Sequence, residues 1–338
     1  MTRRGYIYAA AAVVGSGLLT FLAPKGSLLP GLLFWVALVQ GGVLLMAAAE
    51  IAHSNWHRRI RGIVLGIHPL LWVFPFAFLF FSLGQEIYPW AEHPTGWLDQ
   101  PFFTIRNVAL LLVTAWVGTA FSRAAVRDAP ATRTLAVLYT FLFVTNQTVI
   151  AFDWVMSFEF PWISTLFGAY FFVEAIYLGV AMSAVMAAIL CRRHRAAMGK
   201  TLLDLATLMF GFSLLWVGQF FAQYLVIWYG NIPWEVAYLS KRVLIFPLQQ
   251  MSVFVLLGLF AIPFVSLWAR EMKQTPWWVM LMAGIVSAAV FVERLVFLVP
   301  VAELNALVVA LEMVVLGGAF VLTAAGSMRE GAAELAES

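Results

Sequence analysis

The sequence contains a single cysteine, Cys191, among its 338 residues. An iron–sulfur cluster needs several thiolate ligands, and covalently attached c-type haem needs a Cys-x-x-Cys-His motif, so this chain can hold neither. A b-type haem would need axial histidines deep in an apolar environment. Of the five histidines, only His68 lies well inside an apolar run. If the protein takes part in electron transfer, the redox centres therefore belong to partners or to a mobile quinone.

Charge is also scarce. Only 11% of the residues are charged, whereas soluble proteins carry roughly 25%. Hydrophobic residues make up 63% of the chain, and its mean hydropathy is +0.92. The apolar runs are unbroken for about 20 residues, the length of a membrane-spanning helix, and lack the alternation of a barrel strand. These features predict an all-α integral membrane protein. The net charge of +3 indicates no nucleic-acid partner, because the basic residues fall between the apolar runs.

The apolar runs predict about ten transmembrane helices. Their approximate ranges are 5–24, 30–53, 60–83, 103–122, 133–152, 162–190, 201–228, 242–268, 276–300 and 304–326. The first run follows Arg3 and Arg4 and is similar to a signal peptide, but no small-x-small cleavage site follows it. We expect it to be retained as a helix. The last dozen residues, SMREGAAELAES, are expected to form a short solvated tail.

The distribution of lysine and arginine predicts the orientation, because loops on the cytoplasmic side are enriched in both. One set of connections holds 15 of the 20 basic residues, and the opposite set holds only Lys25, Arg106, Lys241, Arg242 and Arg294. Both termini are therefore expected in the cytoplasm. The outer loops are acidic and aromatic, and their acids are Glu86, Glu92, Asp99, Asp153, Glu159 and Glu235.

A short repeat suggests an internal duplication. The run LLWV at 70–73 recurs at 214–217, and at the same offset Phe76 matches Phe220, Pro89 matches Pro233 and Trp90 matches Trp234. The pattern is that of a parallel duplication of a four-helix unit, or of chance similarity between two membrane helices. On the duplication, residues 1–29 form a flanking helix, 30–153 and 154–300 two four-helix bundles, and 301–338 a second flanking helix with the tail.

Charged residues inside membrane spans are costly, which makes them candidates for function. Glu174 lies about half way along its span and either pairs with a neighbouring helix or takes up and releases protons. His68 precedes Pro69, which loosens the helix there, and is either a structural histidine or a proton relay. Glu293 and Arg294 are adjacent and diverge on a helix, so we expect them to pair with other helices.

Three further features complete the candidates. Glu312 lies within the last span, and Glu50 lies near a cytoplasmic boundary, where an acid can be merely interfacial. The spacing of His53 and His57 would place two imidazoles on one helix face, as in a zinc site. No third ligand or water-activating acid is apparent, so no metal site is predicted.

Four segments resemble a known family. They are YPWAEHPTGWLDQPFFTIRN (88–107), FDWVMSFEFPWISTLFGAY (152–170), FFAQYLVIWYGNIPWE (220–235) and FVERLVFLVP (291–300). Together they resemble the second large quinol-oxidoreductase membrane subunit of bacterial alternative complex III, in the NrfD-like (polysulfide reductase anchor) superfamily. The resemblance extends from about Gly41 to about Pro300.

The resemblance implies two four-helix bundles with flanking helices, in a multi-pass subunit of the bacterial cytoplasmic membrane. It implies a complex that oxidises menaquinol or ubiquinol. Its partners would be a sister NrfD-like subunit, an iron–sulfur subunit, multihaem cytochrome c subunits and small membrane subunits. Iron–sulfur clusters and c-type haems would lie in those partners, and this chain would bind no cofactor. In this family the sister subunit is the better candidate for the quinol site, and this subunit is assigned a structural or proton-conducting role.

The chain departs from the family pattern at two places. Where the family turn more often reads MSLEPHW, Glu159 is followed here by Phe160, Pro161 and Trp162, so the histidine is absent. The family's NLPEE is replaced by NIPWE, in which Trp234 stands for one carboxylate. Both changes remove titratable groups from the outer face, which weakens any role of this loop in binding quinol or releasing protons.

Three functions are consistent with these patterns: a proton-conducting subunit of a quinol-oxidising complex, a secondary transporter built from a parallel repeat, and an architectural anchor. Whether the chain counts as part of an enzyme depends on which one holds. On the first, a proton path would use His68, Asp153, Glu159, Glu174, Glu293, Arg294 and Glu312. A quinone on the outer side would face Arg106, Trp154, Tyr229, Glu235 and Arg242.

Overall fold

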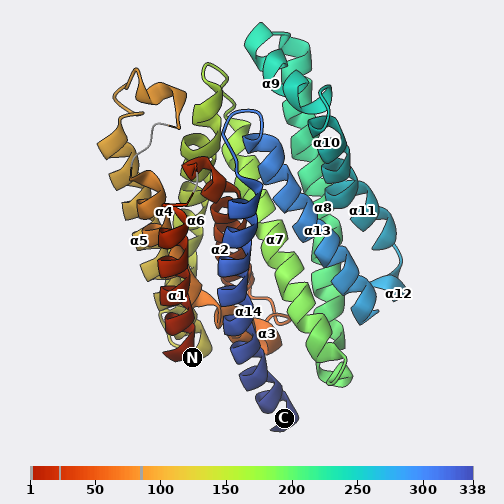
Figure 1. The fold of residues 1–338 in the computed structure, drawn as a ribbon. Helices are drawn as coiled ribbons and strands as arrows, with labels where there is room; N and C mark the ends of the chain where they lie inside the picture. The colour runs from red at the N-terminus through yellow and green to blue at the C-terminus, as the bar shows by residue number, and fades with distance from the viewer. Residues whose placement is uncertain (1–2, 23, 84–86, 338) are drawn as a thin grey trace.

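The computed structural model describes residues 3–22, 24–83 and 87–337, and every regular element within these ranges is helical (Figure 1). Helices satisfy their own backbone hydrogen bonds, which an apolar chain needs where water is absent. Both chain termini lie at the lower end of the bundle in Figure 1, and α9 lies at the upper end. The acidic loop residue Glu86 lies outside the described residues.

The helices α1 to α14 are joined by short 3-10 or π segments, η1 to η6. In chain order the elements are α1 (Arg3–Leu19), η1 (Lys25–Leu28), α2 (Leu29–Ile51), α3 (Arg58–Leu65), η2 (His68–Trp72), α4 (Val73–Ser82), η3 (Pro89–Ala91), α5 (Gln100–Val126), α6 (Thr132–Ile150), η4 (Ala151–Val155), η5 (Met156–Glu159), α7 (Leu166–Cys191), α8 (Arg195–Gly230), α9 (Pro233–Val243), α10 (Leu248–Leu256), η6 (Leu257–Ala261), α11 (Ile262–Ser266), α12 (Arg270–Lys273), α13 (Pro276–Leu298) and α14 (Ala306–Glu337).

Within the described ranges, nine helical segments are long and apolar enough to cross a membrane. They are Gly26–Ile51, Arg58–Ser82, Gln100–Val126, Thr132–Glu159, Leu166–Cys191, Arg195–Gly230, Leu248–Ser266, Pro276–Leu298 and Ala306–Ala333. They correspond to the second to tenth predicted spans. The first predicted span forms α1, a shorter helix of 17 residues that packs along α14 and α4. The chain is therefore a multi-pass membrane protein whose regular structure, over the described residues, is entirely helical.

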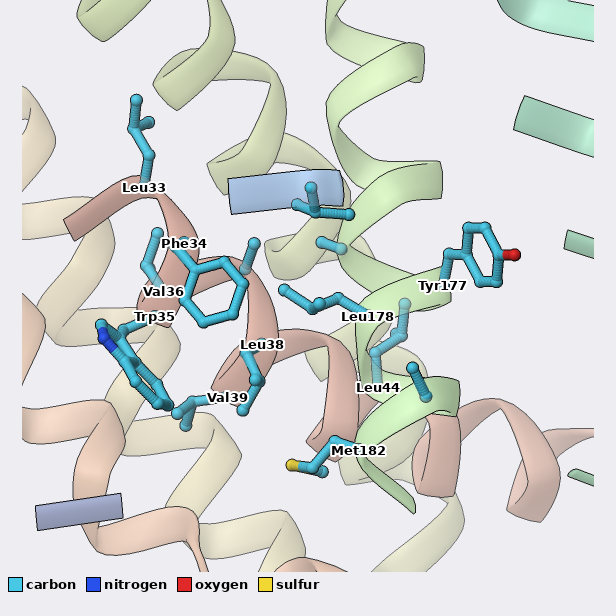
Figure 2. Packing of buried hydrophobic residues seen from close by; sticks show 14 of the residues in the cluster. Leu33, Phe34, Trp35, Val36, Leu38, Val39, Leu44, Tyr177, Leu178 and Met182 are labelled. Carbon is cyan, nitrogen blue, oxygen red and sulfur yellow. The ribbon is translucent and has the colours of Figure 1, made fainter. Parts of the chain in front are cut away.

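Two helices form the centre of the molecule. In its most apolar window, 94% of the α2 segment is buried, and α7 follows with 83%. The two backbones touch, because a Cβ on Gly41 would lie 1.7 Å from the carbonyl oxygen of Ala175. Likewise a Cβ on Gly179 would lie 2.3 Å from the carbonyl carbon of Gly41. In Figure 2, Leu178 of α7 lies toward α2, whereas Tyr177 points away. Small residues at this crossing allow the helices to approach.

The third span is not one continuous helix. It begins as α3, changes to the 3-10 segment η2 at His68 and continues as α4. Pro69 lies at the start of η2, and proline has no backbone N–H for a helical hydrogen bond. The predicted loosening of the helix at this point is confirmed.

Two local predictions are wrong. The eighth span begins at Leu248 and not at 242, because 233–243 form the separate helix α9. His53 and His57 do not share a helix face, since α2 ends at Ile51 and His53 has a positive φ of 53°. The predicted solvated tail is helical, because α14 continues to Glu337. Arg329 and Glu330 in it are exposed, whereas Ser327 donates a hydrogen bond of 2.7 Å to the carbonyl oxygen of Ile63.

The internal duplication stays a prediction. The first LLWV run lies across η2 and the start of α4, and the second lies in the middle of α8. The matched tryptophans also differ in environment, because Trp90 is buried and Trp234 is exposed. The two occurrences of the motif therefore have different local structures.

Candidate functional site

An ion cluster is enclosed between α7, α8 and α13. Arg294 Nη2 lies 2.6 Å from Glu174 Oε2, and both side chains are completely buried. Trp216 Nε1 of α8 donates to the other carboxylate oxygen of Glu174 at 3.0 Å. Tyr170, one turn before Glu174 on α7, donates its hydroxyl to Glu293 Oε1 at 2.5 Å. Glu293 and Arg294 thus each pair with α7 rather than with one another, as predicted.

The helices place this cluster within the bilayer-spanning region. Glu174 is the ninth residue of α7, about 12 Å below the upper end of that helix at 1.5 Å per residue. The guanidinium of Arg294 lies 4.3 Å from the centre of the Phe171 ring, which adds a cation–π contact to the ion pair. The remaining oxygen of Glu293, Oε2, accepts no hydrogen bond from any described residue. The cluster therefore combines two carboxyl groups with one guanidinium.

A cavity of about 230 Å³ adjoins this cluster toward the upper end. Its wall is mainly aromatic and aliphatic, and the rings come from Phe167, Tyr170, Trp216, Phe220, Tyr224, Tyr238 and Phe297. Five other lining residues carry polar side chains: Gln223, Arg242, Gln249, Ser252 and Glu293. The cavity thus brings a buried carboxyl group into contact with an apolar chamber formed by α7, α8, α9, α10 and α13.

A second ion pair closes the upper side of the cavity. Arg242 Nη2 of α9 lies 2.7 Å from Glu159 Oε1 and also donates to the carbonyl oxygen of Phe297 at 3.0 Å. Its guanidinium lies 4.0 Å from the centre of the Tyr238 ring, which stacks on Trp162 with centroids 3.6 Å apart. Burial raises the pKa of Tyr238 to about 12, so this phenol stays neutral at physiological pH.

Asp153 organises a third cluster at the upper end of the first predicted bundle. Arg106 Nε donates to its Oδ2 at 2.8 Å, and Asn107 donates to the same oxygen at 2.7 Å. Trp154 donates its indole N–H to Asn107 Oδ1, which orients the amide. Nearby, burial and then the charge of Asp153 raise the pKa of Tyr88 well above its usual value. Asp153 is therefore a fully partnered carboxylate.

The other predicted proton groups lie elsewhere. His68 is 1% exposed, and its Nε2 lies 3.1 Å from the hydroxyl of Tyr6, which also accepts from Arg123 on α5. Glu312 of α14 accepts from Ser16 of α1 at 3.0 Å, and its second oxygen has no described partner. The structure thus groups Glu174, Glu293 and Arg294 and leaves His68 and Glu312 in separate contacts.

The five residues predicted to face a quinone also lie at separate places in the structure. Arg106 and Trp154 belong to the Asp153 cluster, and Arg242 lines the cavity. Tyr229 is 86% exposed at the end of α8, and Glu235 lies in the first turn of α9. Of this set, only Arg242 takes part in the cavity.

Two groups of residues escaped the sequence analysis. Tyr170 and Trp216 complete the ion cluster, but aromatic residues are too common in membrane spans to single these two out. Gln40 of α2 exchanges hydrogen bonds with Asn146 at 2.8 Å and Gln147 at 2.9 Å on α6. The sequence could have predicted this amide cluster, because Gln40, Asn146 and Gln147 are polar side chains inside apolar spans, and such side chains need hydrogen-bond partners.

The remaining acid near a boundary, Glu50, is also paired. His57 Nε2 and Arg61 Nη1 lie 2.9 Å and 2.8 Å from Glu50 Oε1. Arg61 also binds Asp128, so this group joins α2, α3 and the connection after α5. The contacts account for Glu50 as a structural residue at the lower end.

No protein-family model matches this chain, and a comparison with curated proteins finds no match.

Proposed function

We propose that this chain is an integral membrane subunit of a quinol-oxidising complex of the alternative complex III type, in which it conducts protons and carries no redox centre. The observation that carries the proposal is the buried cluster of Glu174, Arg294 and Glu293. Two carboxyl groups against one guanidinium leave one carboxyl without a counter-charge, and an uncompensated charge inside a membrane is expensive. Such a carboxyl is best accommodated with a proton.

The contacts distinguish the two acids. Glu174 is held by Arg294 and by Trp216, which stabilises its ionised form. Glu293 accepts a hydrogen bond from the hydroxyl of Tyr170, interacts directly with the carboxyl of Glu174, and lines the cavity. Glu293 is therefore the group proposed to take up and release the proton, and Glu174 and Arg294 hold the neighbouring charges in place.

The proposed route continues on both sides of the cluster. Glu159 and Asp153 lie at the upper end, where a proton would leave toward the outer side. Toward the lower end, His68 and Tyr6 form a hydrogen-bonded pair beside Arg123. Water would have to bridge the intervals between these groups. The family resemblance of 88–107, 152–170, 220–235 and 291–300 supports placing this route in a complex whose partners hold the iron–sulfur clusters and c-type haems.

The test uses the whole assembly, purified gently and reconstituted in proteoliposomes. With Glu293→Gln we expect quinol oxidation to persist in the presence of an uncoupler, while quinol-driven proton translocation falls at least about tenfold. Glu303→Gln provides a matched control, because Glu303 is an exposed acid near the same end of the molecule. Unchanged translocation with both Glu293→Gln and Glu174→Gln would remove the cluster from the path.

Co-purification tests membership in the complex. A subunit of this type should isolate together with c-type cytochrome, which is visible in the absorbance spectrum, whereas a secondary transporter should isolate colourless. The interruptions of the membrane helices favour the first outcome. They fall at η2, η4 and η6, and none recurs at the equivalent position of the other proposed bundle within the described residues, unlike the paired broken helices of repeat transporters.

A further inference from the structure

The cavity beside Glu293 has the features of a ligand site that opens toward lipid. Trp216 and Tyr170 lie at the end nearest the ion cluster, where Glu293, which is 4% exposed, also lines the cavity. The Oε2 atom of Glu293 accepts no hydrogen bond from any described residue. On the other side, Val253 of α10 is 52% exposed and Tyr224 of α8 is 40% exposed. A ligand would therefore enter from the bilayer between α8 and α10.

The charges around the cavity favour an uncharged ligand. An anionic headgroup would find no free counter-charge, because the guanidinium of Arg242 is already bound by Glu159 and by two carbonyl oxygens and the carboxyl of Glu293 offers no positive charge. An organic cation would meet Arg242 in the wall and Arg294 behind Glu293. Both kinds of ion would also lose their hydration in an apolar chamber.

The shape and polar groups narrow the ligand further. Stacked aromatic side chains favour a flat ring. Gln223, Gln249 and Glu293 supply hydrogen-bonding groups for oxygen atoms on that ring. At about 230 Å³ the cavity is smaller than the usual site for a drug-sized molecule, so it has room for a ring but not for a long tail.

We propose that this cavity binds the ring of a quinone or quinol, with one ring oxygen at the carboxyl group of Glu293 and the isoprenoid tail leaving between α8 and α10. The choice of a quinone among flat, uncharged ring compounds rests on the proposed function. The site would be additional to the quinol site expected in the sister subunit. The proposal concerns binding alone. An occupied cavity would close the upper approach to Glu293, so that quinone occupancy would control proton exchange with the ion cluster.

Photoaffinity labelling tests the site. The probes are an azido-ubiquinone and an azido-menaquinone with short tails, applied to the purified protein in nanodiscs, with the labelled peptides mapped by mass spectrometry. We expect label on 216–227 and 249–256, displaced by unlabelled short-tailed quinone and not by phosphatidylglycerol. Val253→Trp, which places an indole at the entrance, should reduce this labelling about tenfold. Val265→Trp is the matched control, because Val265 is 71% exposed further along the same span and does not line the cavity.

Glu293→Gln supplies a second variant, in which the shape of the cavity is kept and the carboxyl is lost; we expect weaker labelling with an unchanged labelling pattern. Label spread evenly over the lipid-facing helices, displacement by phosphatidylglycerol, or equal labelling of Val253→Trp and Val265→Trp would overturn the proposal. The experiment is independent of co-purification. Labelling of a colourless, isolated chain would reject the proposed complex and keep the site, whereas absence of label in a haem-containing assembly would reject the site alone.

Discussion

Arg294 is enclosed by α7 and α13, and its charge is balanced by one acid, Glu174, and by the face of Phe171. A buried ion pair adds little net stability, because desolvation offsets most of the attraction between its charges. Removing only one partner lowers the stability strongly, because the other charge then stays buried without a counter-charge. The two residues should therefore depend strongly on one another.

Arg294→Met should lower the free energy of unfolding by about 3–5 kcal/mol, because Glu174 loses its partner. The double variant Arg294→Met/Glu174→Gln should recover a large part of that loss. Thermal unfolding in detergent, analysed as a double-mutant cycle, measures the coupling. Arg329→Met, at an exposed position of α14, is the control and should change little. A double variant as unstable as the sum of both single variants would contradict the pairing.

A second prediction at this scale concerns pH. Burial raises the pKa of Tyr238 to about 12 in the folded protein, from a usual value of 10.0. Between these two values the unfolded chain loses this proton and the folded chain keeps it, so stability should fall as the pH rises from about 10 to about 12. Tyr238→Phe should remove this part of the decline. The measurement is the unfolding midpoint against pH for both proteins; parallel curves above pH 10 would show that the phenol is not protected.

Helix α2 depends on its contact with α7 at two glycines. A Cβ on Gly41 or Gly179 would collide with the backbone of the other helix, which no side-chain rearrangement relieves. Gly218 of α8 has open space around its Cβ position and serves as the control.

Gly41→Ala should destabilise the protein by about 3 kcal/mol or more, because the two helices must move apart. Gly218→Ala should be neutral or slightly stabilising, since alanine favours a helix over glycine by about 1 kcal/mol. The fraction of folded protein after heating in detergent compares the two. Equal behaviour of the variants would show that α2 and α7 are not in backbone contact at Gly41 and Ala175.

At the scale of elements, the sequence predicted much of the fold and little of the site's assembly. Hydropathy located every long apolar segment, and Pro69 marked the break in the third span. Hydropathy separated most of α9 from the eighth span but placed the start of that span at 242, because it could not show that Arg242 and Val243 complete α9 and that the span begins at Leu248. Glu174 was identified because a charged side chain inside a membrane span costs free energy. Its partner Arg294 is 120 residues further along the chain, so no local spacing in the sequence could predict the pairing. The cavity arises from five helices, α7, α8, α9, α10 and α13, and has no sequence motif.

The whole molecule has both termini at one end, as Figure 1 shows. The surplus of lysine and arginine in the connections of that end predicts that it lies in the cytoplasm. Single cysteines introduced into a Cys191→Ser background test this with a membrane-impermeant maleimide. Glu330→Cys should react only after the membrane is opened, and Gly96→Cys should react in intact spheroplasts; both positions are exposed. The reverse pattern would invert the orientation.

The near-complete enclosure of α2 also has a consequence for biogenesis. This helix leaves the ribosome before α6 and α7 exist, so its glycine face and Gln40 must first meet lipid. The partners of Gln40 are 106 and 107 residues further along the chain. Its high mean hydropathy of 2.1 allows this helix to insert into the bilayer on its own and to stay there before its partners are made. Until α6 and α7 are synthesised, the side-chain amide of Gln40 in the inserted α2 has no hydrogen-bond partner. A membrane chaperone would bind α2 at this stage.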